Sequence, residues 1–446
     1  MKTLPLWLIL LAAVPAFAQG HFSGITTSQR VGLMNASINP AELTNLTSKY
    51  EIQVVGASML VSNNKIGFSD LTGGEDFEDL IFRGDEAVNM RIDGAVVLPG
   101  FAMRHGKWSF GLATKAYAKM DLVDVDANIG DAISNNGINI FGSTTISSNE
   151  NQRVSGTSWG EVGLLAARNL FEDEKHRISG GVTLKLLFPG SYTNFGADSF
   201  TGTINSTLSE VTLTDAQANL NIAYSGNLGE SFTEFGDYTR SLFGKLNGVA
   251  ADLGINYQLK GTDNKYRVNA GLSIRNIGSM TFKDNNNAST DYVLSIQGFE
   301  SLNLEVFENA DSMQDVEQIL LNSGYLDKTE RTSTDFKVKL PTTLTAYADV
   351  KIAPTFYVTV FTNQKLKEDS GNDQITGQNV FSVTPRYTLE NFEVWSAWSA
   401  NEFSGLAGGI GLRAYGFYLG SGSIITALIS DAKEADVFVG YSFGLE

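Results

Sequence analysis

The chain carries few residues that could perform catalysis. It contains no cysteine, which excludes thiol catalysis, thiolate zinc sites and disulfides. Its three histidines are His21, beside the expected mature N-terminus, and His105 and His176, in two short turns. None of them lies at the centre of a strand beside a serine, as a Ser–His hydrolase requires. The sequence therefore predicts a protein that is not an enzyme.

Neither a metal site nor a phosphate site is predicted. The acidic run Asp121, Asp124, Asp126 and Asp131 lacks the ligand order of a calcium loop, so a solvated acidic loop is expected. The glycine-rich piece 405–411 falls inside a strand pattern, whereas a phosphate-binding loop joins a strand to a helix. We therefore expect no cofactor.

A group of charged residues falls on the polar faces of segments whose apolar and polar residues alternate. These candidate lumen-lining charges are Lys115, Lys185, Asp252, Arg267, Arg275 and Asp349. An unpaired charge in a narrow interior is costly, so opposite charges are expected to pair across strands. Two interpretations stay open: structural ion pairs that close the interior, or a selectivity lining for a polar or amphipathic solute.

The segments that would position these charges repeat with a period of two. In the segment 249–259, Val249, Leu253 and Ile255 share one face, while Asp252 and Asn256 share the other. A helix would scatter the polar residues around its circumference, so the pattern predicts β-strands.

A soluble β-sandwich also alternates, but three features favour a transmembrane barrel. The segments have about ten residues, which matches a tilted membrane strand better than a sandwich strand. Aromatic residues stand near segment ends, at Trp108, Phe188, Tyr257, Tyr266 and Tyr441. Short and long connections alternate along the chain, as expected of periplasmic turns and external loops.

The predicted fold is thus all-β: an antiparallel transmembrane β-barrel of about 14 strands, within a range of 12 to 16. The predicted strands cover 50–61, 91–103, 107–119, 157–171, 175–188, 248–260, 265–277, 337–352, 355–366, 378–389, 392–401, 405–414, 416–423 and 434–446. The even count places both ends of the barrel on the periplasmic side.

Three parts of the chain are expected. Residues 1–18 read as a signal peptide, with Lys2, a short apolar run and small residues at 16–18. Residues 19–49 would form a periplasmic clamp or a plug in the lumen, and residues 50–446 the barrel. These features predict the outer membrane of a Gram-negative bacterium, with outer-membrane lipid around the barrel.

The longest connections, 190–247 and 279–336, are expected to be irregular external loops with one short amphipathic helix at 311–321. These loops would form either a lid or partner-binding surface, or a solvated surface with no function of its own. The formal net charge of −17 argues against a nucleic-acid partner, which needs a basic footprint.

Several short motifs resemble the FadL-type transporter superfamily and its PorV-like outer-membrane relatives. They are the run 249–254 (VAADLG), the run 272–278 (LSIRNIG), the opening 340–344 (LPTTL) and Asn39-Pro40-Ala41 before the first strand. The resemblance implies that Asn39, Pro40 and Ala41 form an N-terminal hatch motif. The family pattern has glycine where this chain has Glu42. The ligand-binding residues of the transporters do not correspond to identifiable positions in this chain.

The favoured function is a passive channel or transporter for small hydrophobic or amphipathic molecules. The PorV-like resemblance implies the alternative, a non-transporting scaffold or anchor for secreted or surface proteins. An outer-membrane hydrolase is a third, weaker possibility.

Overall fold

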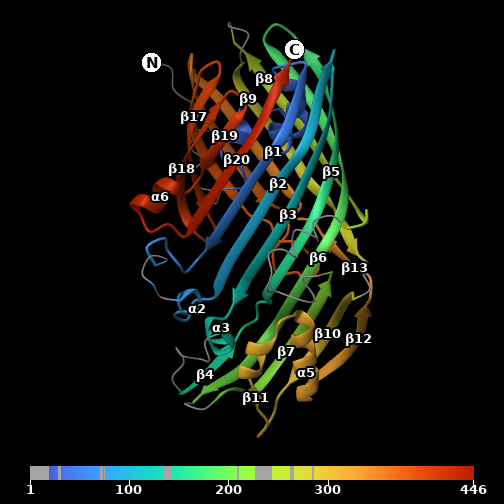
Figure 1. Cartoon of the computed structure of the whole chain (residues 1–446), viewed down its shortest axis with the longest axis vertical. Coiled ribbons are helices and arrows are strands. Elements are labelled where there is room, and N and C mark those ends of the chain that lie inside the picture. The colour runs from blue at the N-terminus through green and yellow to red at the C-terminus, as the bar shows by residue number, and fades with distance from the viewer. Residues whose placement is uncertain are drawn as a thin grey trace, which may run out of the picture.

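A closed ring of antiparallel strands forms the body of the computed structural model (Figure 1). The structure describes residues 20–28, 32–70, 74, 76–134, 142–207, 210–226, 244–261, 266–283 and 286–446. In order around the ring, the strands are β1 (Tyr50–Asn63), β2 (Val88–His105), β3 (Trp108–Val125), β5 (Gln152–Glu172), β6 (His176–Ser206), β8 (Gly248–Lys260), β9 (Tyr266–Phe282), β14 (Thr343–Ala353), β15 (Phe356–Lys365), β16 (Val380–Thr388), β17 (Phe392–Asn401), β18 (Gly405–Ala414), β19 (Phe417–Ser421) and β20 (Glu434–Leu445).

The ring closes because the last strand pairs with the first. The β20–β1 register runs from Tyr50 opposite Leu445 to Ser62 opposite Glu434. Every other neighbouring pair is also antiparallel. The predicted fourteen-strand transmembrane barrel is confirmed, and each predicted strand overlaps one strand of the ring.

The alternation in sequence becomes an outer apolar face and an inner polar face. On β8, Val249, Leu253 and Ile255 are more than half exposed, whereas Asp252 and Asn256 are buried. Such a wall satisfies its backbone groups between strands and presents hydrocarbon to lipid. None of the helices in the described part of the chain is long and apolar enough to cross a bilayer.

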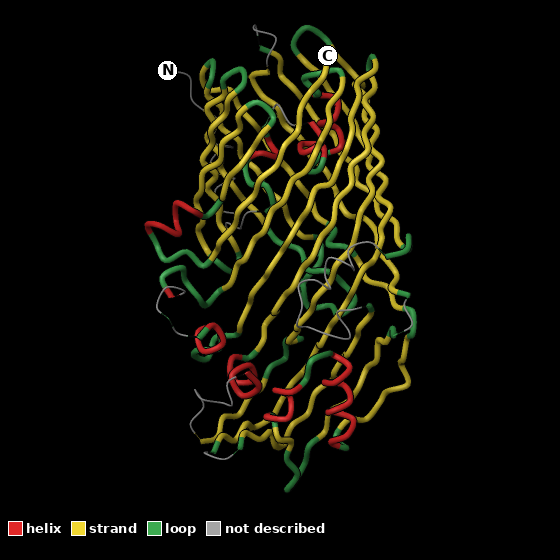
Figure 2. Tube along the Cα trace, in the orientation of Figure 1, coloured by secondary structure: helices red, strands yellow, loops and turns green. Residues whose placement is uncertain are grey.

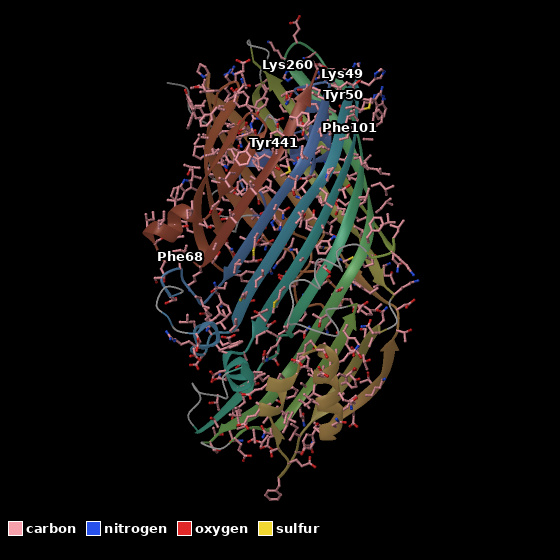
Figure 3. All side chains as sticks on the ribbon, viewed as in Figure 1. Lys49, Tyr50, Phe68, Phe101, Lys260 and Tyr441 are labelled. Carbon is pink, nitrogen blue, oxygen red and sulfur yellow. The ribbon has the colours of Figure 1, made fainter. Side chains whose placement is uncertain are left out.

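Aromatic side chains mark the end of the barrel at which β1 begins and β20 ends, called here the aromatic end. Figure 3 shows Tyr50, Phe101 and Tyr441 together near this end, and the Tyr50 and Phe101 rings stack with centroids 5.9 Å apart. Trp108 and Tyr257 are exposed, as expected of an interfacial girdle. Tyr266, predicted on the apolar face, instead points inward, because the β8–β9 register shifts at Lys260.

Short turns join neighbouring strands at this aromatic end, as the sequence predicts. The turns between β2 and β3, β5 and β6, β14 and β15, and β18 and β19 each contain only two or three residues. The long connections lie at the opposite end, where Figure 1 shows most of the other elements.

The prediction that residues 190–247 and 279–336 form irregular loops is wrong for the parts of these stretches that the structure describes. β6 has 31 residues and continues past the barrel, where its partner changes from β8 to β7 (Val211–Ser225). The further strands are β4 (Gly142–Ser147), β10 (Ala288–Ser295), β11 (Leu302–Asn303), β12 (Leu326–Ser333) and β13 (Phe336–Lys339). β4, β7, β10, β11 and β12 extend the sheet from β6 beyond the ring (Figure 1).

This extension has its own hydrophobic core. Phe200, Leu213 and Tyr292 pack together, and the predicted amphipathic helix is present as α5 (Met313–Ser323), with Met313 and Leu320 buried in the same core. The remaining helices at this end are α2 (Phe77–Ile81), α3 (Ala127–Ser134), α6 (Ile424–Ile429) and the 3-10 helix η7 (Glu305–Asn309). The prediction failed here because strand formation depends on packing against neighbouring strands, and this core exists only when distant segments pair.

The two ends of the barrel can be told apart by cysteine labelling, because the natural chain has no cysteine. Phe299 is fully exposed in the extension, and Lys107 is exposed in a short turn at the aromatic end. We expect a membrane-impermeant maleimide to label Phe299→Cys on intact cells, and Lys107→Cys only after the outer membrane is disrupted. The reverse pattern would contradict the assigned orientation.

Candidate functional site

The segment that precedes β1 lies inside the barrel. The described residues 20–28 and 32–46, called here the N-terminal segment, contain the 3-10 helix η3 (Ile25–Thr27), helix α1 (Gly32–Ala36) and the 3-10 helix η4 (Pro40–Asn45). Figure 2 shows helical turns within the ring near the end where the C-terminus lies. Ile25, Leu33 and Leu43 are almost fully buried against the inner wall.

The motif Asn39-Pro40-Ala41 anchors this segment to the wall. Asn39 caps η4 by accepting a hydrogen bond from the Ala41 amide at 3.0 Å. Pro40, at the first helical position, has no N–H group that would need an acceptor. The Asn39 side chain also donates to the Ile255 carbonyl at 2.8 Å. A Cβ at Gly254 would lie only 2.0 Å from the Asn39 side-chain oxygen. The glycine of the 249–254 motif is therefore required by the close approach of η4 to β8.

Glu42, which replaces the expected glycine, is the centre of a buried hydrogen-bond network. Asn256 and Asn269 each donate to one carboxylate oxygen at 2.9 Å, and Asn45 donates to the other at 2.6 Å. Tyr347 also donates to this carboxylate. Burial raises the pKa of the Glu42 carboxyl above its usual value, although these hydrogen bonds act in the opposite direction.

A second buried network holds the other end of the segment. The Arg386 guanidinium lies 3.1 Å from the Glu393 carboxylate and donates to the backbone carbonyls of Gly24 and Thr27 at 2.8 and 2.9 Å. Asp349, one of the predicted lumen charges, lies 3.8 Å from Arg386 and accepts a hydrogen bond from Tyr266 at 2.5 Å. The network joins the segment to β9, β14, β16 and β17.

His21 stands between a serine and an aspartate. Its Nδ1 lies 3.0 Å from the Ser58 hydroxyl, and its Nε2 lies 2.8 Å from the Asp93 carboxylate, which also pairs with Lys119. This contact could not be predicted, because the three residues are far apart in the chain. The Ser58 hydroxyl does not line the cavity described below, so the arrangement fits a tether better than a nucleophile.

A loop enters the lumen from the opposite end. Residues 366–379, called here the inner loop, join β15 to β16. The long connections were expected to be external loops, and for this one the expectation is wrong. Arg91 of β2 pairs with Asp369 at 2.6 Å, and Arg153 of β5 donates to the Asp369 carbonyl at 2.9 Å. Tyr192 of β6 donates to the Asn372 carbonyl at 2.6 Å. The loop thus crosses from β15 and β16 to the facing wall, because buried arginines there bind its carbonyls.

The N-terminal segment and the inner loop bound a central cavity of about 210 Å³. Its wall contains charged, aromatic and aliphatic side chains from β2, β3, β5, β6, β9, β15 and β16. These include Asp93, Val97, Lys115, Tyr117, Lys119, Trp159, Glu161, Lys185, Arg275, Phe361 and Val380. The Tyr117 and Trp159 rings stack with centroids 4.7 Å apart.

The structure brings together four of the six charges named from the sequence. Lys115, Lys185 and Arg275 line the cavity, and Asp252 lies 2.9 Å from the Lys185 ammonium. Asp349 belongs to the separate network around Arg386. Arg267 is exposed near the start of β9 rather than directed into the lumen. The register shift that turns Tyr266 inward changes the faces of the strand at this point.

A bulge in β9 helps to build the cavity wall. Asn276 has a φ of +59°, in the left-handed region that asparagine tolerates better than most residues. Arg275 and Asn276 both face the cavity, although consecutive residues of a regular strand point to opposite faces. The Asn276 side chain accepts a hydrogen bond from Lys185 at 2.6 Å, and its amide donates to Asp252 at 2.7 Å. The 272–278 motif therefore corresponds to a site-building bulge.

Within the described residues, no group of three or more histidine and acidic side chains is arranged to hold a metal ion.

One family model matches residues 40–422, from η4 to the end of β19, and its description is "Family of unknown function (DUF5723)". The chain belongs to this family. A comparison of the DUF5723 chain with curated protein sequences found no match.

The DUF5723 chain is also similar to solved outer-membrane barrels. The toluene transporter TodX of Pseudomonas putida has 8% sequence identity and a TM-score of 0.43, with 96% of this chain and 98% of that chain covered. A FadL homologue of Pseudomonas aeruginosa has 9% identity and a TM-score of 0.30, with the same coverage. The translocator domain of the autotransporter NalP from Neisseria meningitidis has 7% identity and a TM-score of 0.30, covering 92% and 95%. The fold assignment itself rests on the closed strand pairing.

Replacing Arg386 tests how the N-terminal segment is held. Arg386→Met leaves the Glu393 carboxylate buried without its cation, so we expect a loss of about 3–5 kcal/mol in the free energy of unfolding. Hydrogen exchange should also accelerate at the amides of residues 24–28. The control Lys107→Met, at an exposed lysine of a short turn, should change the unfolding free energy by less than about 0.5 kcal/mol. Equal effects of the two substitutions would contradict the anchoring role.

Glu42 makes the docking of η4 sensitive to pH. Its raised pKa means that the docked segment binds a proton more tightly than a free segment does, so docking strengthens as the pH falls through that pKa and weakens as it rises. We expect slower hydrogen exchange, corrected for the intrinsic rate, at the amides of residues 41–46 at pH 5 than at pH 8. Glu42→Gln keeps a neutral polar side chain and should remove most of this difference. An unchanged difference would assign the pH effect to another group.

Proposed function

We propose that this protein is a passive channel for small hydrophobic or amphipathic molecules. The observation that carries the proposal is the cavity of about 210 Å³ inside the barrel, bounded by one segment from each end of the lumen. Neither segment is a strand of the ring, so either can move without breaking the wall. A solute would pass the inner loop, occupy the cavity and leave past the N-terminal segment.

In this proposal, the N-terminal segment is the gate at the aromatic end. It is held by hydrogen bonds and ion pairs, such as those of Asn39 and Arg386, which can exchange with water. Asn39, Pro40 and Ala41 act as the hatch motif, because they fix η4 against β8 and β14. The division into a plug segment at 19–49 and a barrel at 50–446 follows from this assignment.

We also propose the outer membrane of a Gram-negative bacterium as the location, with lipid around the apolar wall. The wall geometry supports it, since even-numbered barrels with short turns at one end are typical of that membrane. The proposed signal peptide, residues 1–18, lies outside the residues that the structure describes. We further propose that the protein is not an enzyme and that the Ser58–His21 contact is a tether.

A scaffold for secreted or surface proteins remains the second candidate, and the extension favours it. β12 pairs on one side with β10, and Val306, Leu321 and Phe299 are exposed on nearby elements. An exposed strand edge beside apolar side chains is a common place for another chain to bind.

Deleting residues 20–46 distinguishes the two functions. The channel predicts that the deletion raises single-channel conductance in planar bilayers by tenfold or more over the intact barrel, because the lumen loses its largest internal segment. A matched control replaces the same residues with an unrelated linker of equal length, which should give a similar rise. A barrel that stays silent in all three forms, yet is shown to be folded, would contradict the channel and favour the scaffold.

A further inference from the structure

One strand of the ring is shorter than the two strands beside it. β19 has five residues and ends at Ser421, whereas its neighbours β18 and β20 have ten and twelve. β19 pairs with β18 only as far as Ile410, and with β20 only as far as Phe438. Among the described strands, none pairs with residues 405–409 or 434–437 on the side toward β19. The wall therefore has a notch between β18 and β20, at the end opposite the aromatic end.

Residues 422–433 lie beside the notch, and their side chains satisfy its two edges. The Gly408 amide of β18 donates a hydrogen bond to the Thr426 hydroxyl at 3.1 Å. On the other edge, the Asp436 amide of β20 donates to the Ser423 hydroxyl at 3.0 Å. Thr426 and Ser423 are almost fully buried. Two hydroxyl groups thus take the place that the backbone of a longer β19 would have.

Satisfied edges of this kind are required where a sheet meets hydrocarbon. Water can hydrogen-bond to an open strand edge, but lipid offers no donor or acceptor, so an unpaired backbone group there is costly. The helix α6 meets the same requirement, since Ala427 donates to the Ser423 carbonyl at 2.9 Å and Ser430 to the Thr426 carbonyl at 2.8 Å. This pairing is expected of an element that lies in lipid.

The outer face of α6 is apolar. Leu428 and Ile429 are 74% and 73% exposed, Ile424 is also exposed, and residues 421–430 include no charged side chain. Figure 1 shows α6 outside the ring beside β18. Leu406, on the outward face of β18, is exposed as well. The apolar surface of α6 therefore continues the lipid-facing surface of the wall.

We propose that α6 is a lipid-binding element, in which Ile424, Leu428 and Ile429 contact the acyl chains of the bilayer leaflet opposite the aromatic end. Ser423 and Thr426 seal the wall behind it. A helix with one apolar face lies at the boundary between headgroups and acyl chains. The occupant is lipid rather than a second copy of the chain, because the surface is continuous with the lipid-facing wall. The proposal is independent of the channel function, since it concerns the outer surface of the barrel.

Quenching by brominated lipids tests the position of α6, with the full-length barrel in phosphatidylcholine vesicles. One fluorophore is attached to Leu428→Cys, to Leu253→Cys at the lipid-facing centre of β8, or to Phe299→Cys in the extension. We expect brominated acyl chains to quench the first two labels at least about threefold more than the third. Bromines near the headgroup should quench the α6 label more than bromines near the chain end, with the opposite order at Leu253.

The result that would overturn the proposal is an α6 label quenched no more than the label in the extension. Disulfide crosslinking of Leu428→Cys between two barrels, without quenching by lipid, would assign the surface to a second copy and overturn it as well. If Leu428→Cys does not fold, Ile429→Cys replaces it, because the two side chains are equally exposed.

Substitution of Thr426 tests the seal of the notch. Thr426→Val keeps the shape of the side chain but removes the hydroxyl, so the buried Gly408 amide loses its acceptor. We expect the unfolding equilibrium constant in vesicles to rise by about tenfold or more, as for other buried donors left without a partner. The matched control Thr426→Ser keeps the hydroxyl and should unfold much as the natural chain does. Equal stability of the two variants would contradict the seal.

Discussion

The backbone of a lipid-exposed sheet can leave no hydrogen-bonding group unpaired, and the rest of this structure depends on that constraint. The β20–β1 pairing satisfies it by joining the two ends of the sheet. Once the ring is closed, each ring strand has one face in lipid and one in the lumen, so polar side chains are confined to the inside. The charged interior is therefore a consequence of the closed wall. Which of its charges are paired depends on the segments that fold into the lumen.

Two segments fill the lumen, and each is held by the polar groups that closure places there. Arg386 and Tyr347 contact the N-terminal segment, and Arg91 and Arg153 contact the inner loop. In both cases, arginine or tyrosine side chains satisfy carbonyl and carboxylate groups that would otherwise be buried alone. The central cavity is the space that these two sets of contacts leave between the segments.

Most of the wall could be predicted from sequence, because a period of two repeated along ten residues is a strong local signal. β8, β17 and β18 begin and end at the predicted residues. The extension and the inner loop could not be predicted, since their stability comes from distant partners such as Phe200 with Tyr292 and Arg153 with the Asp369 carbonyl. Arg267 shows the same limit on a smaller scale: one register shift at Lys260 reverses the faces that alternation assigns.

The candidate site could also be predicted only as far as local sequence pattern determines it. Alternation was sufficient to direct Lys115 and Lys185 inward, but it could not reveal which cations would find partners. That outcome depends on Asn276, whose left-handed backbone directs two consecutive side chains into the lumen. Lys185 is held by Glu161 of β5 and Asp252 of β8. The Lys185 contacts join residues of three strands, so they depend on how the strands align, which the period of two within one strand does not encode.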